Sequence, residues 1–118
     1  MASINRAQRG AAAEAMAAQF LRSRGLAVVV RNYRCRLGEI DLIARHGDTL
    51  VFVEVRLRSS AAFGGAAASI GAAKRLRMSR AARHYLSTLD DEPPCRFDAI
   101  LLDALDPKRI EWIEDITI

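Results

Sequence analysis

Two acidic residues stand at the spacing of a metal-binding pair. Asp41 and Glu54 flank the dipeptide Gly47-Asp48, which is typical of a two-residue hairpin turn. With that turn Asp41 faces Glu54 directly, and their Cβ atoms would lie roughly 4.5–5.5 Å apart. Carboxylates this close repel each other unless a cation lies between them, and Mg²⁺ or Mn²⁺ commonly takes one or two protein carboxylates together with water and substrate phosphate. The alternative is an exposed hairpin face, on which acidic residues are ordinary.

Two further charged residues interrupt apolar helix faces. Glu14 lies at the centre of a small-residue face that we expect to pack on a sheet, so burial of its charge calls for an arginine or a metal ion beside it. Lys74, one of two lysines beside sixteen arginines, shares an apolar stripe on a second helix. Its ammonium group either points into the site or extends past the stripe to water. The face around Glu14 consists of Ala7, Gly10, Ala11, Ala17, Ala18 and Leu21.

The charges are grouped along the chain. Residues 1–38 contain seven arginines and one glutamate, and residues 55–89 contain six arginines, one lysine and no acid. Between them, residues 39–54 have four acids and one arginine, and residues 90–118 have nine acids against three bases. Basic stretches suit a phosphate backbone, whereas an acidic cluster among them repels one unless a cation intervenes. Ordinary surface charge explains the grouping equally well.

A sheet with helices packed on it is needed to bring these residues together. Helices are expected over residues 4–24 and 69–88, the first ended by Gly25. The order αβββαββ predicts an α/β or α+β domain with a mixed five-stranded sheet. The same hairpin register would pair Glu39 with Arg56. Strands are expected over 26–35, 39–45, 49–57, 96–103 and 109–116, with a loop of small residues over 58–68.

Length and composition limit the class of protein. A chain of 118 residues with net charge +4 suits one domain, which we expect to span residues 1–118. No apolar run approaches the roughly 20 residues of a membrane-spanning helix and no signal peptide is recognisable, so we expect a cytoplasmic protein. Cys35 and Cys95 lack the spacing of a zinc site and are expected to be buried free thiols, while His46 and His84 are expected at the surface.

A glutamate on the first helix, an aspartate in a hairpin and Glu-x-basic on the next strand resemble the PD-(D/E)XK nuclease fold, also called restriction-endonuclease-like. Here those positions are Glu14, Asp41 and Glu54-Val55-Arg56. The segments RNYRCRLGEIDLIA, VFVEVRLRSSAAFG and CRFDAILLD, with the stretch from Lys74 to Leu86, resemble the uncharacterised bacterial YraN-like family, UPF0102, over nearly the whole chain. That family is placed beside archaeal Holliday-junction resolvases by fold, and its members are described mainly as candidate nucleases or nucleic-acid binders.

The resemblance implies a role for each of these residues. Asp41 and Glu54 would ligate Mg²⁺ or Mn²⁺, with Glu14 assisting directly or through water. The nuclease pattern expects a lysine two residues after the second acid, but this chain has Arg56, which stays protonated and cannot act as a general base. Arg56 would instead clamp a phosphate, and Lys74 would supply the missing ammonium group. The bases expected to bind nucleic-acid phosphates beside a closing loop at 63–65 are Arg31, Arg34, Arg36 and Arg58.

We therefore expect a metal-dependent endonuclease that hydrolyses phosphodiester bonds in branched or otherwise structured DNA, recognised by its backbone or shape. DNA in preference to RNA rests on the resemblance alone. The first alternative is a non-catalytic nucleic-acid-binding module of the same fold, impaired by Arg56 in place of the lysine. A more distant alternative is a protein–protein adaptor whose acidic last strands bind a basic partner. Edge strands could pair two copies into a homodimer, although no residue pattern establishes one.

Overall fold

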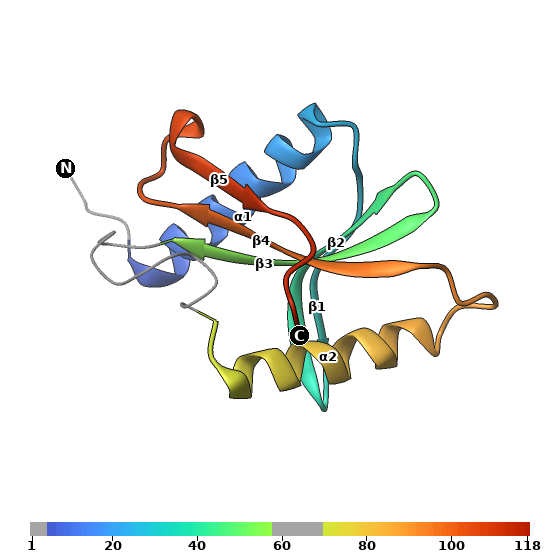
Figure 1. The fold of residues 1–118 in the computed structure, drawn as a ribbon. Helices are drawn as coiled ribbons and strands as arrows, with labels where there is room; N and C mark the ends of the chain where they lie inside the picture. Colours follow the sequence, from blue (N-terminus) through green and yellow to red (C-terminus); the bar gives the residue numbers. More distant parts are fainter. Residues whose placement is uncertain (1–4, 58–69) are drawn as a thin grey trace.

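The structure, a computed structural model, describes residues 5–57 and 70–118 (Figure 1). Arg58 and the whole predicted loop over 58–68, including the closing loop at 63–65, lie outside these residues. Within them the predicted order αβββαββ is confirmed, with a 3-10 turn, η2 (Pro107–Arg109), before the last strand. The elements are α1 (Arg6–Ser23), β1 (Ala27–Cys35), β2 (Gly38–His46), β3 (Thr49–Leu57), α2 (Ala72–Leu86), β4 (Cys95–Leu102) and β5 (Ile110–Ile113).

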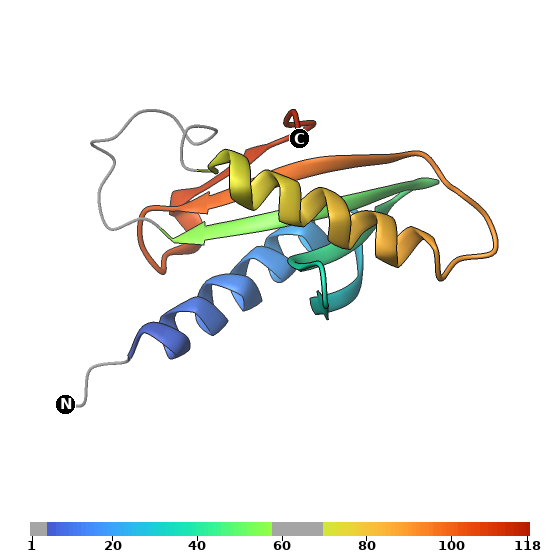
Figure 2. The same ribbon diagram turned by 90° about the horizontal axis from the view of Figure 1, so that it is seen from below.

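The strands form one mixed sheet in the order β1-β2-β3-β4-β5. Every neighbouring pair is antiparallel except β3 and β4, which are parallel and joined through α2. The two helices cover opposite faces of the sheet, as Figure 2 shows. Alternate side chains of β3 divide between the two cores, since Val51 and Val53 pack with α1 whereas Leu50 and Phe52 pack with α2. The expected α+β fold class is therefore confirmed.

Local sequence sets both ends of α1. At its start the Asn5 side chain accepts a hydrogen bond from Gln8 N at 2.8 Å, and the Gln8 side chain accepts one from Asn5 N at 2.9 Å. At its end Gly25 adopts φ +89°, where a side chain is unfavourable, and Leu26 N donates to the carbonyl of Leu21 at 3.0 Å. The predicted stop at Gly25 is confirmed. Neither helix among the described residues is long and apolar enough to cross a membrane.

The predicted register of the β2–β3 hairpin is confirmed. The strand pairing runs from His46 opposite Thr49 to Leu42 opposite Val53, around a turn in which Gly47 adopts φ +61°. Beyond Leu42 the two strands separate, because the start of β2 stays paired with β1 while the end of β3 stays paired with β4. The predicted pairing of Glu39 with Arg56 is therefore wrong, since Glu39 lies opposite Arg34 on β1.

Gly38 holds the β1–β2 hairpin against α2. A Cβ atom at this position would collide with the backbone carbonyl of Arg77, so a residue with a side chain would push the hairpin away from the helix. The close approach places Glu39 next to Lys74 of α2, with 3.6 Å between Oε1 and Nζ. Gly38 thereby fixes the position of β2 just before Asp41.

The burial and contacts of the cysteine and histidine side chains differ partly from expectation. Both cysteines are free, but Cys95 is exposed and Cys35 half-buried, so the expected burial is wrong, because Cys95 begins β4 at the rim of the sheet. His46 and His84 are exposed as expected, yet both have partners. The Tyr33 hydroxyl hydrogen-bonds to Nδ1 of His84, and Arg96 Nη2 lies 3.4 Å from Nδ1 of His46.

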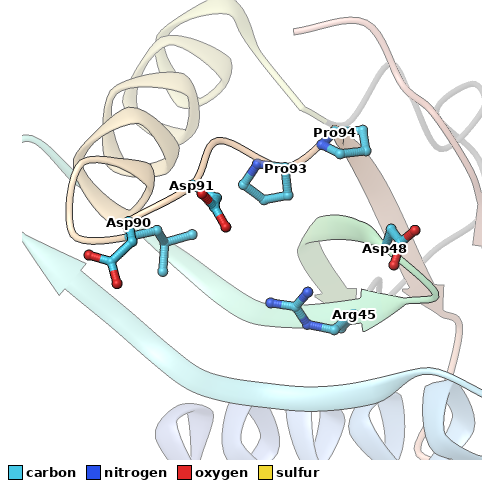
Figure 3. A pocket seen from close by; sticks show the side chains of 7 residues that line it. Arg45, Asp48, Asp90, Asp91, Pro93 and Pro94 are labelled. Atoms are coloured by element: carbon cyan, nitrogen blue, oxygen red, sulfur yellow. The ribbon is translucent and has the colours of Figure 1, made fainter.

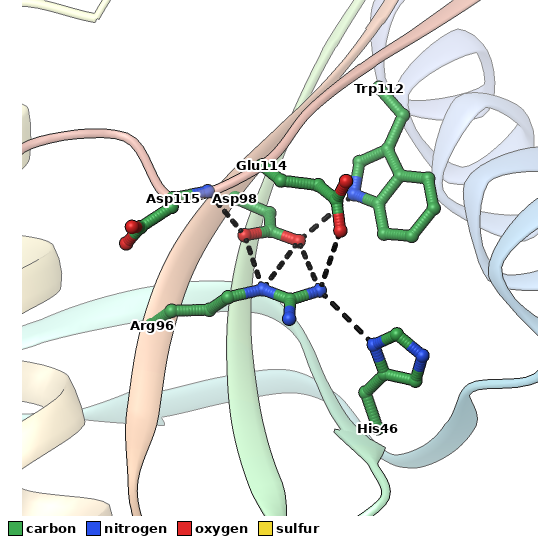
Figure 4. A network of polar contacts seen from close by, with 6 residues as sticks. All are labelled: His46, Arg96, Asp98, Trp112, Glu114 and Asp115. Carbon is green, nitrogen blue, oxygen red and sulfur yellow. Dashed lines mark hydrogen bonds and ion pairs between the residues drawn. The ribbon is translucent and has the colours of Figure 1, made fainter.

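Asp98 on β4 is a fully buried carboxylate that fastens the C-terminal segment to the sheet (Figure 4). Its Oδ1 accepts hydrogen bonds from Asp115 N at 2.9 Å and Arg96 Nε at 3.1 Å, and its Oδ2 accepts one from Trp112 Nε1 at 2.9 Å. Arg96 Nη2 also lies 3.1 Å from Glu114 Oε1. The buried charge is thus paired and hydrogen-bonded at both oxygens, which indicates a structural role.

Asp98→Ala should lower the free energy of unfolding by about 3 kcal/mol, because it leaves a half-buried guanidinium and two N–H donors without their acceptor. Guanidinium unfolding followed by far-UV circular dichroism measures the loss. The matched control is Glu114→Ala, which removes the exposed acid from the same arginine and should cost less than about 1 kcal/mol. Equal losses in the two variants would contradict the structural role of Asp98.

Candidate active site

Glu54 is a buried carboxylate at the centre of a cluster of charged side chains. Its side chain is 3% exposed, and Oε2 lies 3.4 Å from Lys74 Nζ and 3.6 Å from Arg56 Nε. Glu54 and Arg56 come from β3, whereas Lys74 reaches across from the first turn of α2. The structure thus brings Lys74 next to Glu54, in agreement with its place on the inward stripe of the helix. Lys74 also bridges to Glu39 on β2.

Asp41 lies where β2 and β3 separate. Val55 N, one residue beyond Glu54 on β3, donates a hydrogen bond to Asp41 Oδ2 at 2.8 Å. The side chains of Asp41 and Glu54 lie close enough for a protonated Glu54 to donate a hydrogen bond to Asp41. The two acids predicted to face each other therefore do meet.

The surroundings of Glu54 favour its neutral form. Burial, the hydrogen bond to Asp41 and the charge of Asp41 raise the pKa of Glu54 to about 8, against the opposing effects of Lys74 and Arg56. At neutral pH Glu54 is accordingly protonated, and a bound cation would have to displace that proton.

Glu14 approaches the same site from α1. Its Oε1 is buried and has no hydrogen-bond partner among the described residues, and the arginine ion pair considered for it is not present within this part of the chain. Burial and the charge of Asp41 raise the pKa of Glu14, whereas Arg31 and Arg34 act in the opposite direction. A buried carboxyl oxygen without a partner is unfavourable, so Glu14 is a candidate ligand-binding group.

A hollow of about 650 Å³, here called the acidic hollow, opens over these acids. It lies between α1 and the β1–β2 hairpin, and its charged lining residues are Glu14, Glu39 and Asp41 with the arginines Arg6 and Arg34. The other lining residues are Ala7, Gly10, Ala11, Asn32 and Ile40. The hollow therefore gives solvent and ligands access to Glu14 and Asp41, while Glu54 lies buried behind them.

The small-residue face of α1 is only half packed. Ala17, Ala18 and Leu21 are buried as expected, but Ala7, Gly10 and Ala11 are exposed. Figure 2 shows the reason, because the first turns of α1 extend away from the sheet. The expectation that the whole face packs is wrong for this half, since periodicity identifies a helix face without showing how far the opposing sheet reaches.

The arginines predicted to bind phosphate divide into three groups. Arg34 lines the acidic hollow, its side chain is 75% exposed, and its Nε lies 3.7 Å from Glu39 Oε2. Arg36 is exposed in the β1–β2 turn and lines a neighbouring hollow together with Arg34 and Arg77. Arg31 is exposed on β1, close enough to lower the pKa of Glu14. Arg58 lies outside the described residues.

Asn32 is a site residue that sequence reasoning missed. It lines the acidic hollow and adopts φ +55°, the left-handed region, in the middle of β1. Asparagine tolerates this conformation better than the β-branched residues around it. The signal in the sequence is an asparagine that interrupts a β-branched run immediately before the hairpin, in VVVRNYR.

The acidic side chains of the site offer oxygen donors to a metal ion. Among residues 5–57 and 70–118, no three His, Cys, Asp or Glu side chains converge closely enough to hold a metal as a set. Asp41 and Glu54 do meet, and two carboxylates are as many as Mg²⁺ usually takes from a protein. The pair therefore fits the hard oxygen chemistry of Mg²⁺ or Mn²⁺, with Glu14 beside it as a more distant oxygen donor.

A separate hollow of about 480 Å³ lies away from these residues (Figure 3). It is formed by the β2–β3 turn and the connection from α2 to β4, and Arg45 lines it together with acids of both segments. None of the candidate site residues that the structure describes lines it. Its lining residues are Arg45, Asp48, Leu89, Asp90, Asp91, Pro93 and Pro94.

Comparison with known proteins places the chain in a family. Residues 13–102 match the profile of the uncharacterised protein family UPF0102, which covers most of the chain. The chain belongs to the UPF0102 family. Glu14, Asp41, Glu54, Arg56 and Lys74 all lie inside the part that matches UPF0102. The resemblance drawn from the sequence is confirmed at the level of the family.

Individual UPF0102 proteins are similar over nearly their whole length. A UPF0102 protein of Nitrosomonas europaea is 57% identical over 107 residues, which cover 91% of each chain. One of Methylobacillus flagellatus is 57% identical over 108 residues, covering 92% of this chain and 95% of the relative. One of Cupriavidus taiwanensis is 60% identical over 111 residues, covering 93% and 82% respectively. These names assign the family and carry no activity.

Proposed function

We propose that this chain is a divalent-metal-dependent endonuclease that hydrolyses phosphodiester bonds in structured DNA. The observation that carries the proposal is the carboxylate pair of Asp41 and Glu54, in which Asp41 lines the acidic hollow and the buried Glu54 lies with its Oε2 3.4 Å from Lys74 Nζ. Two adjacent acids, one of them buried, are costly for stability and are typical of functional sites. The resemblance to PD-(D/E)XK nucleases assigns the same acids to metal ligation.

Each residue of the candidate site would have a distinct role in binding the metal ion or the phosphate. Asp41 and Glu54 would hold Mg²⁺ or Mn²⁺, which when bound supplies Lewis-acid polarisation of the phosphate and a lower pKa of the attacking water. Lys74 carries a positive charge next to Glu54 and would stabilise negative charge that develops on the phosphate. Arg34 would bind a neighbouring phosphate at the mouth of the acidic hollow. Glu14 would orient water through its unpartnered oxygen.

Arg56 favours a second candidate function. Its guanidinium replaces the lysine that the nuclease pattern expects, and an arginine cannot donate and accept protons at neutral pH. In that case the chain is a nucleic-acid-binding module that does not cut. Arg56→Lys separates the two candidates, because it should restore cleavage in an inactive module and change little in an enzyme that uses Lys74.

The experiment is a cleavage assay on labelled linear, flapped and four-way DNA. The wild-type protein is incubated with Mg²⁺, Mn²⁺ or EDTA, and the double variant Asp41→Asn/Glu54→Gln, purified identically, controls for contaminating nuclease. Cleavage that needs the cation and disappears in the double variant supports the enzyme. Salt-dependent binding without cleavage supports the binding module, and the absence of both contradicts each candidate.

Lys74→Met should lower metal-dependent cleavage about 100-fold while the protein stays folded. Methionine keeps the length and apolar stem of the side chain but removes the ammonium group beside Glu54, and one electrostatic donor typically accounts for about 100-fold or more in rate. Single-turnover cleavage rates measure the effect. Lys108→Met, which alters the other lysine on η2, is the matched control. Equal rates in all three proteins would remove Lys74 from the mechanism.

Arg34→Ala should weaken DNA binding and reduce its dependence on salt. If Arg34 contacts one phosphate, the slope of log K against log salt concentration should become shallower by about 0.9. Fluorescence anisotropy in EDTA, which prevents cleavage, gives the slope. Arg109→Ala on η2 removes the same charge from a different surface and should leave the slope nearly unchanged. An unaltered slope in Arg34→Ala would place the phosphate elsewhere.

A further inference from the structure

A second hollow, here called the arginine hollow, lies on the other side of α1's first turns. Its volume is about 570 Å³, and the residues that line it are Arg6, Arg9, Gly10, Val55, Arg56 and Leu57. Those described lining residues include three arginines and no acid, in contrast to the acidic hollow. The two hollows share Arg6 and Gly10, so they adjoin along the exposed start of the helix.

Arg6 and Arg9 occupy an unfavourable place for basic residues. The N-terminus of a helix carries a partial positive charge, so acids stabilise the first turn and bases destabilise it by a few tenths of a kcal/mol each. α1 has no acid in its first turn and begins with these two arginines. Neither forms an ion pair with a residue that the structure describes. Stability of the helix therefore does not explain them.

Gly10 is equally unfavourable for the helix. A glycine inside a helix costs about 1 kcal/mol relative to alanine. Packing does not require it, because a Cβ atom at Gly10 would have nothing within 4 Å among the described residues. The open space over Gly10 belongs to both hollows. An absent side chain here keeps the passage between them free.

Arg56 completes the arginine hollow from the sheet. Its side chain is 37% exposed, and its Nε is buried without a hydrogen-bond partner among the described residues, at 3.6 Å from Glu54 Oε2. The exposed part of this guanidinium can donate hydrogen bonds to an anionic oxygen. Three departures from local stability therefore meet at one place, which is the pattern expected of a binding site.

We propose that the arginine hollow, formed by Arg6, Arg9 and Arg56, binds a phosphate of the nucleic-acid strand next to the one held at Asp41 and Glu54. This inference rests on the proposed function and extends it by naming the path of the strand across Gly10. A phosphodiester backbone fits because it presents regularly spaced anions to a cationic hollow that adjoins an acidic one. Arg56 then serves as a phosphate-binding residue, which explains why a permanently charged side chain stands there.

The test is binding of a fluorescein-labelled 20-bp DNA duplex by anisotropy in EDTA across a range of salt concentrations. Arg6→Gln/Arg9→Gln should make the slope of log K against log salt shallower by about 0.9, because the contact with one phosphate is lost. Arg22→Gln/Arg83→Gln removes the same charge from the far ends of the two helices and should leave the slope nearly unchanged. Equal slopes in the two double variants would overturn the inference.

Gly10→Leu tests the path of the strand without harming the fold. Leucine is a better helix former than glycine, and a Cβ atom at this position has no atom of the described residues within 4 Å, so the melting temperature should stay equal or rise. Affinity for the duplex should nevertheless fall at least about 10-fold, because the side chain fills the shared space. Affinity equal to wild type would overturn the path.

The outcomes separate this inference from the proposed function. Cleavage by the wild type, together with equal slopes in the two double variants, would support nuclease activity and contradict phosphate binding by the arginine hollow. Binding that depends on Arg6 and Arg9 without any cleavage would retain the arginine hollow and reject catalysis. If the wild type binds neither the duplex nor the flapped and four-way DNA, both proposals fail.

Discussion

Asp41→Asn and Glu54→Gln should each lower metal-dependent DNA cleavage at least about 1000-fold. Each substitution keeps the shape of the side chain and replaces a potential metal ligand with a neutral amide. Metal-assisted polarisation contributes several kcal/mol to a phosphoryl-transfer reaction, and about 4 kcal/mol corresponds to this factor. The two losses should not multiply in the double variant, because both acids serve one cation. Single-turnover cleavage rates in Mg²⁺ and Mn²⁺ provide the measurement.

Binding distinguishes a lost ligand from a lost fold. Both variants should bind the same DNA in EDTA with wild-type affinity or better, since removing negative charge from the acidic hollow reduces repulsion of phosphate. Asp48→Asn, at the hairpin turn and remote from Glu54, is the matched control and should cleave at the wild-type rate. Substantial cleavage by Asp41→Asn or Glu54→Gln would reject these residues as the metal ligands.

Much of the candidate site could be predicted because a two-residue turn sequence, Gly47-Asp48, sets the register of the β2–β3 hairpin. Once Gly47-Asp48 forms the turn, the strand pairing runs as far as Leu42 opposite Val53 and so brings Asp41 and Glu54, the next residue on each strand, to the same place on the sheet. The position of Lys74 could also be predicted, since helical periodicity alone places it on the apolar stripe of α2. Both inferences depend only on short segments of sequence, for which turn type and helical periodicity are sufficient.

The errors arise where a contact depends on how far an element extends. Extending the hairpin register along both strands pairs Glu39 with Arg56. However, β2 and β3 separate after Leu42, so Glu39 pairs with Arg34 instead. The same separation gives Asp41 access to Val55 N and to Glu54. Arg6 and Arg9 of the arginine hollow were missed for a related reason, because sequence does not show that the first turns of α1 project beyond the sheet, whereas Arg56 was predicted to bind a phosphate.

The stability of the protein should fall as pH rises through the range in which Glu54 keeps its proton only in the folded state. The folded pKa is about 8 against an ordinary value of 4.5. Between these values the folded chain binds more protons than the unfolded chain, so rising pH favours unfolding by up to about 1.4 kcal/mol per unit. Below about 4.5 both states are protonated, and above about 8 both are ionised, so Glu54 contributes no slope there.

Glu54→Gln isolates this contribution, because glutamine does not titrate and other ionisable groups largely cancel in the comparison. The free energy of unfolding of the variant, relative to wild type in EDTA, should increase by as much as about 4 kcal/mol from pH 5 to pH 8 and then level off. Guanidinium unfolding followed by Trp112 fluorescence supplies the values, with Glu39→Gln, an exposed acid bonded to the same lysine, as the control. Adding Mg²⁺ at pH 8 should stabilise the wild type and not Glu54→Gln, since the cation takes the place of the proton between Asp41 and Glu54. Parallel pH curves for Glu54→Gln and wild type would mean that Glu54 is ionised in the folded protein, and Lys74 would then be its partner in a plain buried ion pair.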